Sequence, residues 1–423
     1  MIFNVNTPRI RLLQTAPDHP ALEPFPARRE SHLFLVELAR VLHHSGVSAD
    51  GLENTISDLA RRLGESVQVF CTPTSVQLAF DTPQGQQVFL LRTDPAPVHL
   101  GKLTQLRAVL DDVLQERISL TDAQVRLCEL ECSPQRYSGL ATIGAFALLS
   151  GTSCCFFGGT RLDTAASVLI GALIGALSRL AVGQIALGRA FEPLAAALAT
   201  FCAHLFIPMG ASSEVVTLSA LVVLLPGFTL TTGLSELANR HLVSGTARLS
   251  AAGISFLSIA FGVALGRTFA QHLSLVPTEL GQSLPPFSQW VALALAPIGF
   301  AILFQAQIRH SGWILAAGVL GFLGARLGTT MLGAELGVCV GSLVVGLGGN
   351  LLARRTHLPA SLMQVPGVMM LVPGSIGFRS LASFLDKNVL FGIDSAFRMV
   401  LVAVALVAGL LFANLLVSPR RAL

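Results

Sequence analysis

The sequence predicts a mainly α-helical, polytopic membrane protein whose membrane part follows a small α+β domain. Three observations predict this fold class. The chain of 423 residues is 52% hydrophobic and only 12% charged, whereas soluble domains average about 25% charged residues. The charge is concentrated in residues 1–136, and residues 137–423 contain long apolar runs. A Leu-Pro-Gly or Val-Pro-Gly motif occurs in two of those runs, at Pro226 and at Pro373.

The first residues do not have the pattern of a secretory signal. Residues 1–29 are rich in proline and are expected to be disordered. They contain Arg9, Arg11 and Asp18 and have no apolar core of the kind that a signal peptide requires. We therefore expect the N-terminal part of the chain to stay in the cytoplasm.

Residues 30–136 are predicted to form a cytoplasmic α+β domain. Helical periodicity begins at Ser31, and a second helix is expected from about Asp50 to Gly64. The period then changes to two, which predicts three short antiparallel strands. Two further helices complete the domain. The strands are expected near 67–71, 76–80 and 88–90, and the helices over 103–113 and from 121.

The motifs of this domain favour no enzymatic function. His43 and His44 have no evident nucleophile or paired carboxylate beside them, and no GxSxG, P-loop or strand-linked GxGxxG occurs. The seven cysteines lack a zinc-binding spacing and are interpreted as small buried residues. The net charge of +4 shows no basic stripe for a nucleic acid. We expect no enzyme, no cofactor, no metal and no nucleic-acid partner.

Ten transmembrane spans are predicted in the apolar part, each close to the 20 residues that cross a bilayer. Several contain small-residue patterns that let helices approach closely, such as Gly171-x-x-x-Gly175 and Gly262-x-x-x-Gly266. The spans are expected near 138–157, 163–185, 190–208, 213–233, 247–267, 289–308, 312–329, 333–352, 360–378 and 396–417.

The two Pro-Gly motifs indicate an internal duplication. Pro226 and Pro373 are 147 residues apart (373 − 226 = 147), and Leu234 and Leu381 keep this offset. Each motif falls in the fourth of five spans. Because five is odd, the second copy enters the membrane from the opposite side, and such inverted repeats are typical of secondary transporters. The two five-helix repeats are expected over 137–270 and 285–418.

An even number of spans places both termini on the same side of the membrane. The excess of positive residues favours a cytoplasmic side for both, and we expect the protein in the inner or plasma membrane. Inner loops and tail would hold Arg189, Arg240, Arg248, Arg309, Arg354, Arg355, Arg420 and Arg421. Outer loops would hold Arg161, Arg267, Arg326, Arg379 and Lys387.

The Pro-Gly segments are the candidate substrate site. A proline inside a span frees a backbone carbonyl, which must be satisfied by protein or in a water-filled cavity. A half-helix N-terminus suits a carboxylate, and unwound carbonyls suit an ammonium group, so two facing broken helices suit an amino acid. We expect one break in the fourth span and two in the ninth, although the prolines alternatively only kink these helices for packing. The candidates are Pro226, Gly227, Thr229, Thr231, Thr232, Pro366, Gly367, Pro373, Gly374 and Ser375.

Three carboxylates are candidates for proton coupling. Glu214 and Glu236 flank the first Pro-Gly segment, and Glu192 begins the preceding span. An ionisable residue in a membrane segment is by default a functional hypothesis. The alternative is that each carboxylate lies at the interface and is solvated.

The order of three sequence segments resembles the threonine/serine exporter family. The resemblance covers nearly the whole chain after about residue 30, and its motifs are specific mainly through their order. The first segment contains Leu38-Ala39, His44-Ser45-Gly46-Val47 and Leu63-Gly64. The second contains Leu225-Pro226-Gly227-Phe228-Thr229-Leu230-Thr231-Thr232-Gly233, Glu236-Leu237 and Ser244-Gly245-Thr246-Ala247-Arg248-Leu249. The third contains Pro359, Val365-Pro366-Gly367 and Leu371-Val372-Pro373-Gly374.

This resemblance implies ten spans in two fused five-span halves and export of small hydroxy amino acids, driven by the proton motive force. Split relatives are associated with succinate, so a dicarboxylate substrate remains an alternative. A channel or sensor gated by the cytoplasmic domain is an alternative of another class. The expected partners are L-threonine, L-serine or a dicarboxylate, together with the lipid bilayer, and a homo-oligomer is left open.

Overall fold

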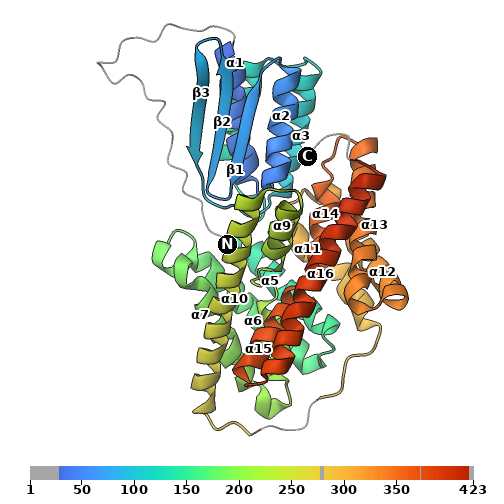
Figure 1. Cartoon of the computed structure of the whole chain (residues 1–423). Helices are drawn as coiled ribbons and strands as arrows, with labels where there is room; N and C mark the ends of the chain where they lie inside the picture. The colour runs from blue at the N-terminus through green and yellow to red at the C-terminus, as the bar shows by residue number, and fades with distance from the viewer. Residues whose placement is uncertain (1–27, 277–280, 372, 419–423) are drawn as a thin grey trace.

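A computed structural model describes residues 28–276, 281–371 and 373–418 of the chain (Figure 1). An N-terminal α+β unit stands at one end of a bundle of helices (Figure 1). We call the bundle end that contacts this unit the proximal end and the opposite end the distal end. The predictions for residues 1–27 and for Arg420 and Arg421 lie outside the described residues.

The α+β unit has the predicted elements. A stripe of buried leucines fixes the face of each helix, and Ser48 and Ser119 precede α2 and α4 in extended conformation. The first helix begins at Arg28, two residues before the predicted boundary. The elements are α1 (Arg28–His44), α2 (Ala49–Arg62), β1 (Val67–Thr72), β2 (Ser75–Thr82), β3 (Gly85–Arg92), α3 (Leu100–Leu114) and α4 (Leu120–Cys132).

The three strands form an antiparallel sheet in the order β1-β2-β3. Tight turns set the register, with Thr72 paired to Ser75 and Thr82 paired to Gly85. Strand β2 buries Val76, Leu78 and Phe80 in one core with the helices of the unit. Alternate side chains in a strand point to opposite faces, so the period of two in the sequence determines which face is buried.

The bundle follows the predicted spans closely in position. Proline-containing linkers divide two of the spans into short helices. The helices are α5 (Gly139–Phe156), α6 (Arg161–Ala181), α7 (Ile185–Leu205), α8 (Ser213–Leu221), α9 (Gly227–Ala238), α10 (Leu242–Gln271), α11 (Ser288–Leu303), α12 (Ser311–Leu332), α13 (Ala334–Arg355), α14 (Ser361–Met369), α15 (Gly374–Leu385) and α16 (Val389–Leu416).

Eight helical stretches in the described part of the chain are long and apolar enough to cross a membrane. Two of the ten expected spans do not meet this length criterion. The segment 213–233 is divided into α8 and α9, of 9 and 12 residues, and α11 is apolar but has 16 residues. The helical, apolar character is therefore as predicted, and length alone supports eight crossings.

Small residues bring the long helices into close contact, as the sequence patterns predict. A side chain added at Gly171 of α6 would collide with Ser150 of α5, and one at Gly262 of α10 would collide with the Pro193 carbonyl of α7. In the second half, Gly328 of α12 lies directly against Gly337 of α13. Backbone-to-backbone approach of this kind is how membrane helices associate where both partners are apolar.

The two halves of the bundle repeat the same packing pairs. In the first half α10 packs on α7 and α9, and in the second half α16 packs on α13 and α15. Helices α9 and α15 also start 147 residues apart (374 − 227 = 147) and end 147 residues apart (385 − 238 = 147). Each of these two short helices additionally contacts the long last helix of the other half. Element boundaries and packing contacts therefore recur at the same offset as the two Pro-Gly motifs.

Candidate functional site

The first helix break lies at Pro226. Helix α8 ends at Leu221, and α9 begins at Gly227 after a short turn in which the Leu224 N–H donates to the Leu221 carbonyl. The Leu230 N–H donates to the Pro226 carbonyl at 2.9 Å and closes the first turn of α9. The N–H groups before Leu230 in α9 have no partner within the helix, because a helix start leaves its first donors unpaired.

The second break lies at Pro373, and it touches the first. A Cβ built on Gly374 would lie 3.0 Å from the Leu225 Cβ and 3.7 Å from the Gly227 Cα. The starts of α9 and α15 therefore meet at one point inside the bundle. From there α9 runs toward the α+β unit, where Asn239 bonds Asp50, and α15 runs to the distal end, where Asp386 pairs with Arg267 at the end of α10.

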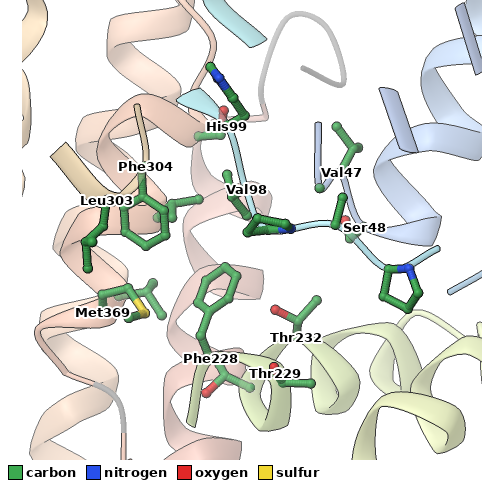
Figure 2. Close-up of a pocket in the computed structure, with 18 of the residues that line it drawn as sticks. Val47, Ser48, Val98, His99, Phe228, Thr229, Thr232, Leu303, Phe304 and Met369 are labelled. Atoms are coloured by element: carbon green, nitrogen blue, oxygen red, sulfur yellow. The ribbon is translucent and has the colours of Figure 1, made fainter. Parts of the chain in front are cut away.

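A cavity of about 600 Å³ extends from the α+β unit to the first break. Its walls come from α5, α6, α7, α9, α10, α13, α14 and α16, and from the end of α11. Two loops of the α+β unit form its roof: one leads from α1 to α2 and contains Val47 and Ser48, and the other leads into α3 and contains Val98 and His99 (Figure 2). Phe228 projects from the start of α9 into this space, toward Val98 (Figure 2).

Five of the predicted candidates line the cavity: Pro226, Thr229, Thr231, Thr232 and Glu192. The side chains of Thr229 and Thr232 face the cavity (Figure 2), and both are half-buried. The Thr231 hydroxyl is buried and donates to the Gly227 carbonyl at 3.0 Å, so it satisfies an acceptor of its own helix. The hydroxyls of Thr229, Thr232 and Ser235 thus remain on the cavity wall of α9.

The Pro-Gly residues of the ninth span do not line the cavity, although Gly374 contacts Leu225, which does. Gly227, Pro366, Gly367, Pro373, Gly374 and Ser375 are all absent from the cavity wall. The expectation of two breaks in the ninth span is wrong, because α14 continues through Pro366 and Gly367 and the chain breaks only before Gly374. Gly367 packs against Val345 of α13 instead, and a proline in so short a helix sacrifices a single backbone hydrogen bond.

Glu236 lies at the junction with the α+β unit and is fully buried. Its carboxylate accepts hydrogen bonds from the Ala49 N–H at 2.9 Å and from the Ser244 hydroxyl at 2.7 Å. The Arg248 Nε lies 3.0 Å from each of its oxygens. Since Ala49 is the first residue of α2, this carboxylate occupies a helix N-terminus, where negative charge is favoured. Glu236 is not among the residues that line the cavity.

The other two candidate carboxylates have different surroundings. Glu214 is exposed in the first turn of α8, at the end of that helix away from the break. Glu192 is half-buried on the cavity wall of α7 and accepts a hydrogen bond from the Ser255 hydroxyl of α10 at 2.9 Å. Of the three, only Glu192 combines burial in the bundle with access to the cavity.

Two groups of cavity residues were given no role from the sequence. Arg179 of α6 lines the cavity. Asn350 of α13 is fully buried, and it donates to the Asn414 side chain at 2.8 Å and accepts from the Gln364 amide at 3.0 Å. These three amides come from three helices and form one polar wall. Single amides in apolar runs carry no periodic signal, so only the fold brings them together.

The roof of the cavity is mostly apolar, and its polar side chains are those of Ser48 and His99. Burial, with a smaller contribution from Lys102, lowers the pKa of His99 to about 4, so its imidazole is neutral near pH 7. Its Nδ1 accepts a hydrogen bond from the Lys102 N–H and caps α3. Among the described residues, no group of three or more His, Cys, Asp or Glu side chains is placed to hold a metal ion.

The apolar helices identify a multi-pass membrane protein, and comparison with known proteins assigns its family. Two family models described as threonine/serine exporter match residues 33–270 and residues 289–416. The chain belongs to the threonine/serine exporter family, and both halves are present in one polypeptide.

Curated relatives include fungal membrane proteins of greater length. Pheromone-regulated membrane protein 10 of Yarrowia lipolytica is 24% identical over 85% of this chain and 31% of its own length. The Saccharomyces cerevisiae protein of the same name is 24% identical over 87% of this chain and 48% of its own length. The chain therefore spans between a third and a half of these relatives. No solved structure matches it.

Proposed function

We propose that this protein is a secondary transporter that exports small hydroxy amino acids, threonine and serine, from the cytoplasm, driven by the proton motive force. The observation that carries the proposal is the cavity of about 600 Å³ that ends at the Pro226 break. Its volume falls in the range of small-molecule sites. The hydroxyls of Thr229 and Thr232 face it beside the unpaired N–H groups of a helix start, which is a suitable place for a substrate carboxylate.

The proposed orientation puts the α+β unit in the cytoplasm, as the loop charges favour. The cavity then lies on the cytoplasmic side, from which an exporter must take its substrate. The distal end is packed across the two halves: Arg267 pairs with Asp386, and Arg379 lies over the Phe157 ring. Together these features correspond to an inward-facing state in an alternating-access cycle.

The course of α9 and α15 supports an inverted repeat. The two helices occupy equivalent positions 147 residues apart, start from one point and run to opposite ends of the bundle. Opposite directions for equivalent helices are what an inverted duplication requires. In this proposal α8 with α9, and α14 with α15, each make one broken crossing, and α11 makes a short crossing, which gives ten in all.

Coupling to protons requires a carboxylate that substrate or solvent can reach. We place this role at Glu192, because it is half-buried on the cavity wall within the membrane part. A proton and a cationic substrate group would compete for one carboxylate, which is the simplest basis for exchange. Glu236 is the second candidate, because it is fully buried in the same helix as the first break.

The direct test is transport in proteoliposomes that contain the purified full chain. Labelled L-threonine, L-serine and succinate would each be followed with and without a proton gradient, and with unlabelled substrate trapped inside. We expect saturable counterflow of threonine and serine that a proton gradient enhances. Succinate counterflow without amino-acid flux would assign the protein to dicarboxylates instead. Flux that never saturates and shows no counterflow would indicate a channel and refute the carrier mechanism.

A further inference from the structure

The charges in the cavity wall are not all neutralised. Four residues with ionised side chains line the cavity: Arg248, Asp50, Arg179 and Glu192. Arg248 is occupied by the Glu236 carboxylate. Asp50 accepts a hydrogen bond from Asn239 at Oδ2, its Oδ1 is buried without a hydrogen-bond partner, and it lies in the first turn of α2, where the helix dipole offsets part of its charge. On the helices of the bundle, Arg179 and Glu192 are the two charges of the cavity wall that have no ionic partner among the described residues.

Arg179 has no ionic partner in the described part of the chain. Its side chain is half-buried and lies beside Gly139 at the start of α5, where the guanidinium Nε is 3.0 Å from the position of a Cβ on that glycine. Neither a hydrogen bond nor an ion pair joins it to another described side chain. Glu192 has the Ser255 hydroxyl as its single described partner, and no cation lies within ion-pair distance among the described residues.

These two charges lie on neighbouring helices and at similar depth. Arg179 is two residues before the end of α6, and Glu192 is seven residues after the start of α7. At 1.5 Å per residue, their Cα atoms differ in depth by roughly 8 Å. An unpaired charge in a membrane segment is costly and marks a substrate or ion pathway. Here two helices of the bundle each bring to the same cavity one charge, of opposite sign, that has no ionic partner among the described residues.

We infer that Arg179 and Glu192 are the specificity-determining pair of this cavity, and that they select a zwitterionic substrate. Arg179 binds the substrate carboxylate, for which its planar fork of donors is suited. Glu192 binds the substrate ammonium group. The hydroxyls of Thr229 and Thr232 are left for the polar side chain. A dicarboxylate is disfavoured, because its second carboxylate would face Glu192.

This inference rests on the proposed function and deepens it. It predicts that Arg179 recognises the carboxylate of the substrate and that Glu192 recognises its ammonium group. Ligands that lack one of these two groups test each contact separately. L-Threoninol lacks the carboxylate of L-threonine, and 3-hydroxybutanoate lacks the ammonium group. Binding of these ligands and of succinate would be measured on the purified full chain, in competition with labelled L-threonine.

The variants are Arg179→Gln and Glu192→Gln, with Arg326→Gln as the matched control. Arg326 is also an arginine of the membrane part, 147 residues after Arg179 (326 − 179 = 147), but it is exposed and away from the cavity. Loss of a charge-assisted hydrogen bond corresponds to about 10- to 100-fold in affinity. We expect Arg179→Gln to lower the affinity for threonine by that factor and the affinity for threoninol by less than about 3-fold.

Glu192→Gln is expected to lower the affinity for threonine similarly and to leave the affinity for 3-hydroxybutanoate unchanged or higher. Arg326→Gln should change none of these affinities. If Arg179→Gln does not fold, Arg179→Lys keeps the charge without the fork and should retain part of the carboxylate selectivity. The inference is overturned if Arg179→Gln weakens threonine and threoninol equally, or if succinate binds the wild-type chain more tightly than threonine. If the wild-type chain neither binds nor transports threonine or serine, the proposed function fails as well.

Discussion

Replacement of Glu236 by Gln should loosen the α+β unit from the helix bundle. The carboxylate accepts hydrogen bonds from Ala49, Ser244 and Arg248. An amide in its place has one oxygen replaced by an NH₂ group, which is itself a donor and therefore cannot accept from these three donors. Glu236 is 0% exposed and the Arg248 side chain is 21% exposed. Removal of one partner of a buried pair costs about 3–5 kcal/mol. Because the Arg248 side chain is partly exposed to solvent, we expect the free energy of unfolding to fall by an amount near the lower limit, about 3 kcal/mol.

A companion substitution separates docking from proton transfer. Ala49→Pro removes the N–H that donates to Glu236 but leaves the carboxylate intact. Proline is tolerated at the first position of a helix, and the preceding Ser48 already has the extended conformation that proline requires (φ −65°, ψ 157°). Ala49→Pro removes one hydrogen bond to a charged group, which should lower the free energy of unfolding by about 1.5–3 kcal/mol. Ala49→Gly keeps the N–H and is the control.

Docking can be followed by the rate of tryptic cleavage after Arg136, an exposed residue in the segment between α4 and α5. This segment is held to the bundle because the Tyr137 hydroxyl donates to the Ala306 carbonyl at 2.8 Å. Both Glu236→Gln and Ala49→Pro should accelerate cleavage relative to Ala49→Gly. Unchanged cleavage in both would refute the docking role.

Transport by the same variants then decides whether Glu236 also carries the coupling proton. If Glu236→Gln abolishes proton-driven flux and Ala49→Pro leaves it intact, the carboxylate itself is required for coupling. Equal losses in the two variants would assign the effect to docking. Proton-driven flux that is unchanged in Glu236→Gln would exclude Glu236 from coupling and leave Glu192 as the candidate.

Three further outcomes are expected. Gly374→Leu should reduce transport at least about 10-fold by pushing the second break away from Leu225, and an equal loss of protein from the membrane would point to folding instead. Burial lowers the pKa of His43 to about 4, so between pH 6.5 and pH 4 the unfolded chain binds a proton at this residue and the folded chain does not. The free energy of unfolding should therefore drop by about 3 kcal/mol as the pH falls through that range. In denaturant titrations, the free energy of unfolding of His43→Gln should depend less on pH. Asn350→Leu removes the acceptor of the half-buried Gln364 amide and should cost about 0.5–1.5 kcal/mol, seen as a lower midpoint of thermal unfolding.

The sequence by itself determined the elements of this protein, because their signals are local. Period-two alternation placed the three strands, and proline with glycine placed the starts of α9 and α15. The constant offset of 147 predicted an internal duplication before any contact was known. Local signals failed at Pro366, because whether a proline breaks a short helix or is accommodated depends on the neighbours that pack against it.

The tertiary structure alone decided which residues share a site. Glu236 and Glu192 look alike in the sequence, yet one is held by an N–H of α2, 187 residues earlier in the chain, and the other faces the cavity. Arg179 gains its significance only because α7 brings Glu192 to the same cavity and, among the described residues, no ion pair neutralises either. The roof over the cavity comes from two loops, and the motif at Gly46-Val47 in one of them did not indicate that it would cover a cavity. Charge pairing and enclosure depend on distances between segments far apart in the chain, and a linear pattern contains no information about those distances.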